Sequence, residues 1–203
     1  MTSSTAQTAN LVVMISGNGT NLQAILDACA AGKLPAKVCA VASNKSDAFG
    51  LERARRAGVP ALAFPKPREL DRREYDSQLA DRVLSFRPDW IVLAGWMRVL
   101  SAGFIGRFPG RVINLHPALP GAFPGIHSIE RAFDAFQRGE IPHTGVMIHL
   151  VPDEGVDCGP VLAQEIVPIR PGDTLENLEE RIHAVEHRLL VDTIGKVLAS
   201  SQT

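Results

Sequence analysis

Cysteine, aromatic residues and long apolar runs are all scarce in this chain. Three cysteines without a Cys-x-x-Cys pair do not suit a disulfide framework and favour a reducing cytoplasm. No segment approaches the ~20 consecutive apolar residues that a membrane-spanning helix requires. Residues 1–10 lack the charged and apolar regions of a secretory signal peptide. We therefore expect a cytoplasmic protein with a short disordered tail over residues 1–10 and no membrane partner.

A strong excess of charge of one sign is also missing. The chain has 21 Lys and Arg against 22 Asp and Glu, and its basic residues are scattered along the sequence. A nucleic-acid-binding protein typically concentrates basic residues on one surface, so we expect small-molecule partners and no nucleic acid. The 203 residues suit one domain with a sizeable core, over residues 11–203. The oligomeric state is left open between a monomer and a homodimer.

Short apolar runs alternate with segments of helical periodicity. Strands are expected at residues 11–15, 38–42, 61–64, 90–94, 111–116, 146–151 and 161–169. Helices are expected after residue 21, at 46–57, 71–86 and 128–138, and from residue 173 onward, with capping-box spacing at 71/74 and 173/176. The alternation predicts an α/β fold: a Rossmann-like, mostly parallel twisted sheet with helices on both faces, C-terminal strands and a long terminal helix.

A glycine-containing turn follows the first expected strand. Its sequence, Gly17-Asn18-Gly19-Thr20-Asn21, would let backbone N–H groups approach an anion, and the helix that follows adds its positive dipole end. Leu22 stands where the dinucleotide signature has a third Gly or Ala, so the turn favours a monophosphate over a pyrophosphate. The alternative is a tight strand-to-helix turn without a ligand.

Asn114 and His116 lie at the end of an expected strand, where strand periodicity places both side chains on one face. An amide donor, an imidazole and a carboxylate are the groups needed to form and collapse a tetrahedral intermediate at a carbonyl. Asp157, in a Gly- and Asp-rich loop, offers the carboxylate. The alternatives are a structural Asn and His bonded to loop backbone, and an aspartate that only stabilises a turn.

A second motif that contains histidines lies near the C-terminus. His183-Ala-Val-Glu186-His187 matches the His-x-x-Glu-His motif of inverted zinc metallopeptidases. A zinc site needs a further protein ligand, and Asp192 is the sole candidate among the residues that follow. We therefore expect no metal at this motif.

Five segments in order carry a resemblance to a known family. They are Val13 to Ile25, Ser43-Asn44-Lys45, Ala94 to Leu100, Asn114-Leu115-His116-Pro117 and Asp157-Cys158-Gly159-Pro160. Together they resemble the phosphoribosylglycinamide formyltransferase family over about residues 11–197. Each motif alone is weak, whereas the ordered set is highly specific.

The resemblance implies formyl transfer from the co-substrate 10-formyltetrahydrofolate to the amine of glycinamide ribonucleotide in purine biosynthesis, without a metal. It implies that Asn114 and a protonated His116 hold the oxyanion, while Asp157 orients His116 and favours its charged form. It implies that the phosphate and ribose of the nucleotide contact Gly17, Asn18, Gly19, Thr20, Asn21 and Glu186. The residues implied for folate are Arg73, Met97, Arg98, Val99, Leu100 and Asn114. About residues 11–100 would then bind phosphate, and about 101–203 would carry catalysis and folate binding.

Three other functions stay open at this point. Formyltetrahydrofolate hydrolase and methionyl-tRNA formyltransferase can share the Asn/His/Asp set, although each is expected to carry an additional domain. A non-catalytic phosphate-binding module would use the glycine turn alone. The chain also departs from the family's common pattern after Pro117, where Ala118-Leu119-Pro120-Gly121 replaces Ser-Leu-Leu-Pro.

Overall fold

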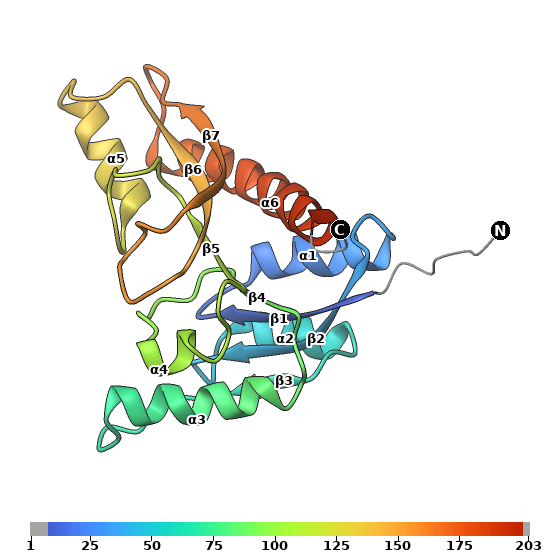
Figure 1. Ribbon diagram of the computed structural model, residues 1–203. Coiled ribbons are helices and arrows are strands. Elements are labelled where there is room, and N and C mark those ends of the chain that lie inside the picture. The colour runs from blue at the N-terminus through green and yellow to red at the C-terminus, as the bar shows by residue number, and fades with distance from the viewer. Residues whose placement is uncertain (1–7, 201–203) are drawn as a thin grey trace.

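The computed structural model describes residues 8–200, and in this range seven strands form one sheet with helices on both faces (Figure 1). The strands are β1 (Ala9–Ile15), β2 (Ala36–Ser43), β3 (Ala61–Ala63), β4 (Trp90–Leu93), β5 (Val112–His116), β6 (His143–Leu150) and β7 (Val161–Pro168). The helices are α1 (Thr20–Ala30), α2 (Phe49–Arg56), α3 (Arg72–Leu84), α4 (Ala102–Ile105), α5 (Ser128–Gln137) and α6 (Leu175–Ser200). The predicted α/β fold with a mostly parallel sheet and a long terminal helix is confirmed.

The strand order is β3-β2-β1-β4-β5-β6-β7. Strands β1 to β5 pair in parallel, while β6 and β7 are antiparallel to their neighbours. The chain winds outward from β1 in one direction through β2 and β3, and then returns to place β4 on the other side of β1. This reversal between β1 and β4 is the topological switch point at which open α/β sheets bind ligands.

Alternate residues of the buried strands serve the two faces of the sheet. In β1, Leu11, Val13 and Ile15 pack in the core that contains α1, α2, α5 and α6. Val12 and Met14 belong to the opposite core, which contains α3 and α4. Because these strands are buried on both faces, they read as continuous apolar runs, which is typical of parallel sheets.

Several element boundaries differ from those expected. Strand β1 begins at Ala9, inside the segment 1–10 that was expected to be disordered, because its backbone pairs with β2 from Ala9 onward. The rest of that tail, residues 1–7, lies outside the described residues. Helix α2 begins at Phe49, three residues later than expected, and the short helix α4 was not predicted.

Helix α6 begins two residues later than expected, at Leu175, because its cap is not the 173/176 pair. Thr174 and Asn177 form the reciprocal capping box: the Asn177 N–H donates to Thr174 Oγ1, and the Thr174 N–H donates to Asn177 Oδ1, both at 3.2 Å. The carboxylate of Asp173 instead accepts two hydrogen bonds of 2.8 Å from Arg181. At the other predicted capping box Asp71 does cap α3, accepting from the Arg73 and Glu74 N–H groups.

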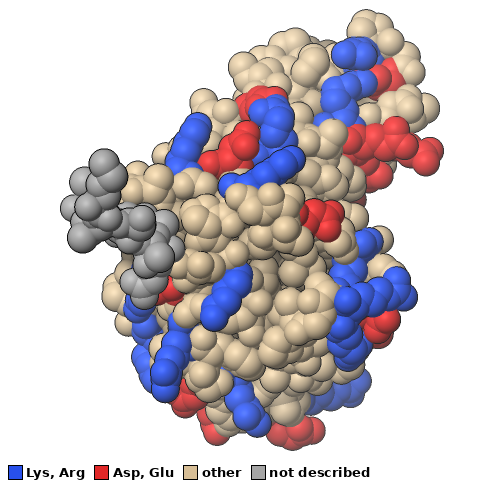
Figure 2. All heavy atoms as spheres, turned by 90° about the vertical axis from the view of Figure 1, so that its right-hand side faces the viewer, with Lys and Arg blue, Asp and Glu red and all other residues tan. Residues whose placement is uncertain are grey.

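The outer surface mixes both signs of charge. Lys and Arg side chains lie among Asp and Glu side chains across the face shown in Figure 2. Within residues 8–200, no helix combines the length and apolar character needed to cross a membrane.

Candidate active site

The carboxyl ends of β1, β4 and β5 lie side by side at the switch point of the sheet. Ser16, directly after β1, contacts the loop after β2 and the loop after β4. Ser16 Oγ accepts a hydrogen bond of 2.8 Å from the Met97 N–H and donates one of 2.5 Å to Asn44 Oδ1. The loops after β1, β2 and β4 are therefore fixed to one another. The segment around Met97 thus lies next to the end of β1.

Asn114, His116 and Asp157 lie in direct contact. Asn114 Nδ2 donates to Asp157 Oδ1 at 3.0 Å, and His116 Nδ1 lies 3.2 Å from Asp157 Oδ2. The carboxylate thus bridges two side chains that leave the same face of β5, as strand periodicity predicted. The structure brings together all three residues of the expected set.

His149 is a fourth member of this group, and sequence reasoning left its role undecided. It pairs with Asn114 across the antiparallel β5 and β6 strands, which puts both side chains on one face. Its Nδ1 lies 2.8 Å from the Leu150 carbonyl oxygen, which can only accept, so Nδ1 carries the proton. His149 Nε2 is then an acceptor for Asn114 Nδ2 at 3.0 Å. Both amide protons of Asn114 are therefore engaged, one by Asp157 and one by His149.

His116 is held between two acceptors. Its Nε2 lies 3.1 Å from the Phe123 carbonyl oxygen, and its Nδ1 faces Asp157. This arrangement satisfies both nitrogens only in the charged imidazolium, and Asp157 and the Phe123 carbonyl raise the pKa of His116 accordingly. Burial has the larger effect and lowers the pKa of His116 below its ordinary value. Asp157 thus favours the charged form of His116, as expected, while desolvation favours the neutral ring and has the larger effect on the pKa.

Asp157 sits in the 151–160 loop between β6 and β7, in a left-handed backbone conformation with φ of 52°. Its Oδ2 accepts a hydrogen bond of 2.8 Å from the Gly125 N–H. Burial raises the pKa of Asp157, but the His149 ring, the Gly125 N–H and His116 together lower it, and the net pKa is below the ordinary value. A carboxylate that stays ionised can orient His116 throughout a reaction.

Strained backbone is concentrated around this group. Among the described residues, four non-glycine residues have positive φ, and three of them, Phe123, His127 and Asp157, lie in the 117–127 and 151–160 loops beside His116. Such conformations cost about 1–3 kcal/mol each and cluster at functional sites. Arg131 holds one of them in place, since its Nη2 donates to the Phe123 carbonyl oxygen at 2.7 Å.

The packing of the fold explains why residue 19 of the glycine turn is a glycine, but it does not explain the glycine at residue 17. Gly19 is the N-cap of α1 with φ of 75°, and a Cβ there would lie 2.8 Å from Gly50 Cα. A Cβ on Gly17 would meet no atom within 4 Å. No side chain caps the first turn of α1, so its leading N–H groups remain free for an anion. The tight-turn explanation therefore accounts for Gly19 but leaves Gly17 unexplained.

Arg53 of α2 fixes this turn from behind, and sequence reasoning missed it. Its Nε donates to the Asn18 carbonyl oxygen at 2.9 Å, and its Nη2 donates to Asn18 Oδ1 at 2.7 Å. Its Nη1 reaches Gln23 Oε1 at 3.3 Å. No sequence signal marks it, because 35 residues separate Arg53 from Asn18.

Asn21 and Glu186 meet although 165 residues separate them. Asn21 Nδ2 donates to Glu186 Oε2 at 3.0 Å, and both side chains are buried. Burial raises the pKa of Glu186, an effect that the Asn21 hydrogen bond only partly opposes. Asn21 Oδ1 is also buried and has no partner. The two residues expected at the nucleotide thus form one pair next to the glycine turn.

The segment expected at folate is divided between surface and core. Met97 and Val99 are exposed large apolar side chains, 59% and 41% accessible, whereas Leu100 packs in the core. The Arg98 guanidinium carbon lies 5.3 Å from the centre of the Tyr75 ring, and Arg98 Nε is buried without a partner.

Arg73, expected to contact folate, is exposed on α3. Its neighbour Arg72 reaches the 151–160 loop instead, where it pairs with Glu154. The other Glu154 oxygen accepts a 2.8 Å hydrogen bond from the Ala102 N–H. The loop that carries Asp157 is therefore tied to α3 and α4 through Glu154.

The zinc motif does not converge on one point. His183 is exposed, whereas Glu186 is buried against Asn21. In the part of the chain that the structure describes, no group of three or more His, Cys, Asp or Glu side chains is arranged to hold a metal ion.

Sequence and structure comparisons place this geometry in a known context. The Formyl transferase family model matches residues 9–194. The chain belongs to the formyl transferase family. Its relatives include phosphoribosylglycinamide formyltransferase of Schizosaccharomyces pombe, 47% identical over 96% of this chain and 99% of the relative. The enzyme of the same name from Escherichia coli is 43% identical over 89% of this chain and 82% of the relative.

Solved structures of the family agree with the fold described above. Glycinamide ribonucleotide transformylase 1 from Symbiobacterium toebii is 41% identical, with a TM-score of 0.89 over 96% of this chain and 89% of that chain. Phosphoribosylglycinamide formyltransferase from Bacillus halodurans is 39% identical, with a TM-score of 0.87 over 95% and 96%. The formyl transferase relatives thus match this chain along nearly its whole length.

Proposed function

We propose that this chain transfers the formyl group of 10-formyltetrahydrofolate to the amine of glycinamide ribonucleotide. The names of its relatives state formyl transfer to this nucleotide for them. The observation that carries the proposal is the direct contact of Asn114, His116 and Asp157 at the switch point of the sheet. These are the donor, the base and the orienting carboxylate that acyl transfer needs. They lie beside a turn whose free N–H groups suit a phosphate.

His116 is the proton carrier in this proposal. The lowered pKa of His116 favours the neutral ring, and with its proton on Nδ1 toward Asp157 this ring can act as a base through Nε2. Nε2 faces the Phe123 carbonyl oxygen in the structure, so the substrate amine must take the place of that oxygen beside it. As the amine attacks the formyl carbon and a C–N bond forms, Nε2 takes the amine proton. The same proton then passes to N10 of the folate as the C–N10 bond breaks. Asp157 stabilises the imidazolium between the two steps.

Asn114 stabilises the oxyanion of the tetrahedral intermediate. Both of its amide protons are engaged in the structure, so one must be released to the formyl oxygen. His149 is the natural group to yield, because it is a neutral acceptor whereas Asp157 is charged. An oxyanion donor of this kind contributes about 3–4 kcal/mol to transition-state stabilisation.

The nucleotide binds along the glycine turn and Glu186. The phosphate lies against the N–H groups of Gly19, Thr20 and Asn21, and an absent side chain at Gly17 lets it approach. The buried Asn21 Oδ1 lacks a donor, and a ribose hydroxyl supplies one. Arg53 adds positive charge behind the turn and holds it in shape.

The folate binds where Met97 and Val99 expose apolar surface, between the loop after β4 and the 151–160 loop. Arg98, whose Nε lacks a partner, supplies a donor at this edge. Arg72 is a stronger candidate than Arg73 for a contact with the folate, because Arg72 already reaches the 151–160 loop. We also propose a cytoplasmic location, in keeping with three free cysteines.

A formyl-transfer assay with purified protein, 10-formyltetrahydrofolate and glycinamide ribonucleotide tests the proposal. We expect stoichiometric formylation of the nucleotide, and release of folate that depends on the nucleotide. Equal formyl loss with and without nucleotide would indicate a hydrolase and overturn the transferase assignment. Nucleotide binding without any formyl transfer would indicate a non-catalytic module.

A further inference from the structure

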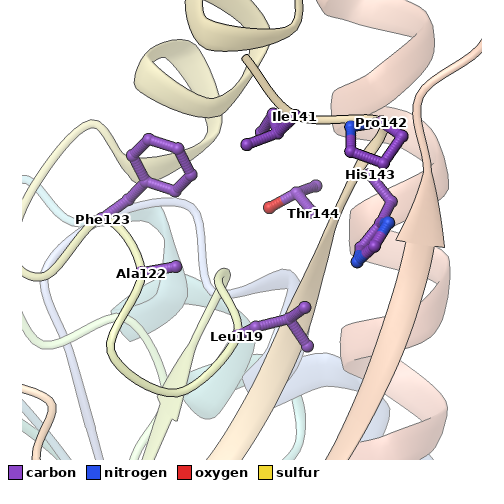
Figure 3. A pocket seen from close by; sticks show the side chains of 7 residues that line it. All are labelled: Leu119, Ala122, Phe123, Ile141, Pro142, His143 and Thr144. Atoms are coloured by element: carbon purple, nitrogen blue, oxygen red, sulfur yellow. The ribbon is translucent and has the colours of Figure 1, made fainter.

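An apolar pocket of about 200 Å³ lies between the 117–127 loop and the start of β6 (Figure 3). Leu119, Ala122 and Phe123 line it from the loop, and residues 141–144 line it from the other side. We call it the Phe123 pocket. Its lining contains none of the residues assigned above to catalysis, nucleotide or folate, so it is a separate cavity.

Thr144 places an unsatisfied hydroxyl in this apolar setting. The residue is only 3% exposed, and within residues 8–200 its Oγ1 has no hydrogen-bond partner. In Figure 3 the hydroxyl points into the space enclosed by the lining side chains, toward Ala122 and Phe123. A buried polar group without a partner is unfavourable and requires an explanation. A bound molecule with a hydrogen-bonding group supplies one.

The size and charge of the pocket define that molecule. A dry apolar cavity of ~150 Å³ is large enough to bind benzene, so the Phe123 pocket accommodates one substituted ring. No Asp, Glu, Lys or Arg lines it, so a charged ligand would lose its hydration without gaining a counterion. The preferred ligand is therefore uncharged, with one planar ring and one hydrogen-bonding substituent that meets Thr144.

Phe123 connects this pocket to His116. Its ring lines the pocket, while its carbonyl oxygen lies 3.1 Å from His116 Nε2. The backbone of Phe123 has φ of 47°, so ring and carbonyl are held by a strained residue. A ligand that moves the ring therefore turns the peptide group that His116 contacts.

The other end of the loop is anchored, which directs any movement toward Phe123. Leu119 packs over Gly145 of β6, and its Cδ2 lies 2.4 Å from the point where a Cβ on Gly145 would be. Only a glycine leaves room for this packing. Leu119 is thus fixed against the strand, whereas Phe123 is held through its carbonyl oxygen by Arg131 and His116, and these are the contacts that a ligand would have to rearrange.

We propose that the Phe123 pocket binds a small uncharged molecule with one ring and one hydrogen-bonding group, and that its occupation displaces the Phe123 carbonyl from His116. The binding step does not depend on the reaction proposed above. The site would give the enzyme a regulatory input that does not compete with either substrate.

Phenol and toluene are matched probes, because they share size and shape and differ in one hydroxyl. Thr144→Val is the matched protein change, because it removes the hydroxyl and keeps the β-branched shape. Binding is followed by chemical shifts of the Leu119, Ala122 and Ile141 methyl groups. We expect saturable binding of both probes, with dissociation constants on the order of a millimolar. In Thr144→Val, phenol should bind about 5- to 10-fold more weakly, while toluene affinity stays within about twofold.

Ala122→Leu serves as the second variant, because it fills the cavity. We expect it to fold like the wild type, as judged by its amide spectrum, and to bind neither probe. Failure of both probes to saturate in the wild type would overturn the site, as would binding that survives in Ala122→Leu. Loss of phenol and toluene affinity by equal factors in Thr144→Val would overturn the role of the hydroxyl.

The ring resonances of His116 report separately on whether a ligand in the Phe123 pocket changes the contact between the Phe123 carbonyl and His116. Saturating phenol should shift the His116 Nε2 resonance in the wild type and leave it unchanged in Ala122→Leu. A probe that saturates the pocket without moving this resonance would overturn the link through Phe123. The measurement needs no substrate, so its outcome is independent of whether formyl transfer is observed.

Discussion

Asn114 Nδ2 and Asp157 Oδ1 are joined by a 3.0 Å hydrogen bond across 43 residues of sequence. The bond links a strand end to a loop, and it brings the carboxylate within reach of His116 as well. One aspartate thereby fixes the orientation of an amide and of an imidazole. The consequences of removing its charge are therefore larger than those of an ordinary loop substitution.

Replacing Asp157 with Asn should lower both kcat and the pKa of His116. The Asp157 charge raises that pKa, so its removal leaves burial even less opposed. A histidine that cannot hold the transferred proton loses its catalytic effect, which is typically about 10²- to 10⁴-fold. The pKa is measured from His116 ring shifts and kcat from the transfer assay.

Asp153→Asn is the control, because Asp153 lies in the same loop and its carboxylate accepts from the nearby Gly155 N–H. It should leave kcat within about twofold, as expected for a surface change away from special features. If Asp157→Asn retained wild-type kcat, the proposed role of Asp157 would be wrong.

Replacing Asn114 with Leu should reduce kcat by about 10²- to 10³-fold, because one oxyanion donor is lost. KM for both substrates should change little, since the donor acts on charge that develops only in the transition state. His149→Phe is the informative comparison, because it removes the competing acceptor of the Asn114 amide while keeping a planar ring. We expect it to retain far more activity than Asn114→Leu; an equal loss would make His149 a catalytic partner and not only an acceptor.

Sequence patterns predicted the strand-end residues and failed on contacts between distant elements. Period-two alternation in β5 correctly placed Asn114 and His116 on one face, because a strand has only two faces. The same pattern does not reveal which residue of β6 pairs with which residue of β5, so His149 was given no role in the site. Only the family resemblance predicted that Asp157 lies near this pair, because a left-handed residue in a loop gives no periodic signal in the sequence.

Sequence reasoning anticipated the effect of Asp157 on the pKa of His116 but not the larger effect of burial. A nearby carboxylate is visible in a motif, and it predicts a raised pKa. Desolvation depends on how deeply the ring is buried, which only the packed structure determines, and here it outweighs the carboxylate. The same limitation hid Arg53, whose contacts with Asn18 exist only once α2 packs beside the glycine turn.

Replacing Arg53 with Met should raise KM for the nucleotide substrate and leave kcat nearly unchanged. The substitution keeps an apolar stem and removes three hydrogen bonds to Asn18 and Gln23 that hold the phosphate-binding turn. Hydrogen bonds to a charged group contribute about 1.5–3 kcal/mol, so KM should rise by about 10-fold or more. Steady-state kinetics with varied nucleotide measure the effect.

Arg55→Met, on the same helix, is the matched control. Arg55 is exposed and pairs with Glu52 at 3.6 Å on the same helix, so its loss should not affect KM. An equal rise of KM in both variants would indicate a general effect of positive charge and would contradict a specific role for Arg53.

Replacing Glu186 with Gln should make the folded protein less sensitive to rising pH. Burial raises the folded pKa of Glu186 above its ordinary value, so the unfolded chain loses the proton first as pH rises. The stability linked to the protonated carboxyl is complete below the unfolded pKa and is lost as pH rises through the folded pKa. Glutamine cannot ionise, yet its oxygen can still accept from Asn21 Nδ2. The variant should therefore melt at a higher temperature than the wild type at pH 7, and the two melting temperatures should converge below about pH 4.

The KM of the Glu186→Gln variant for the nucleotide should also rise, because the ionised carboxylate is the stronger acceptor for ribose hydroxyls. A melting-temperature difference that is constant from pH 4 to pH 8 would show that Glu186 does not titrate as proposed.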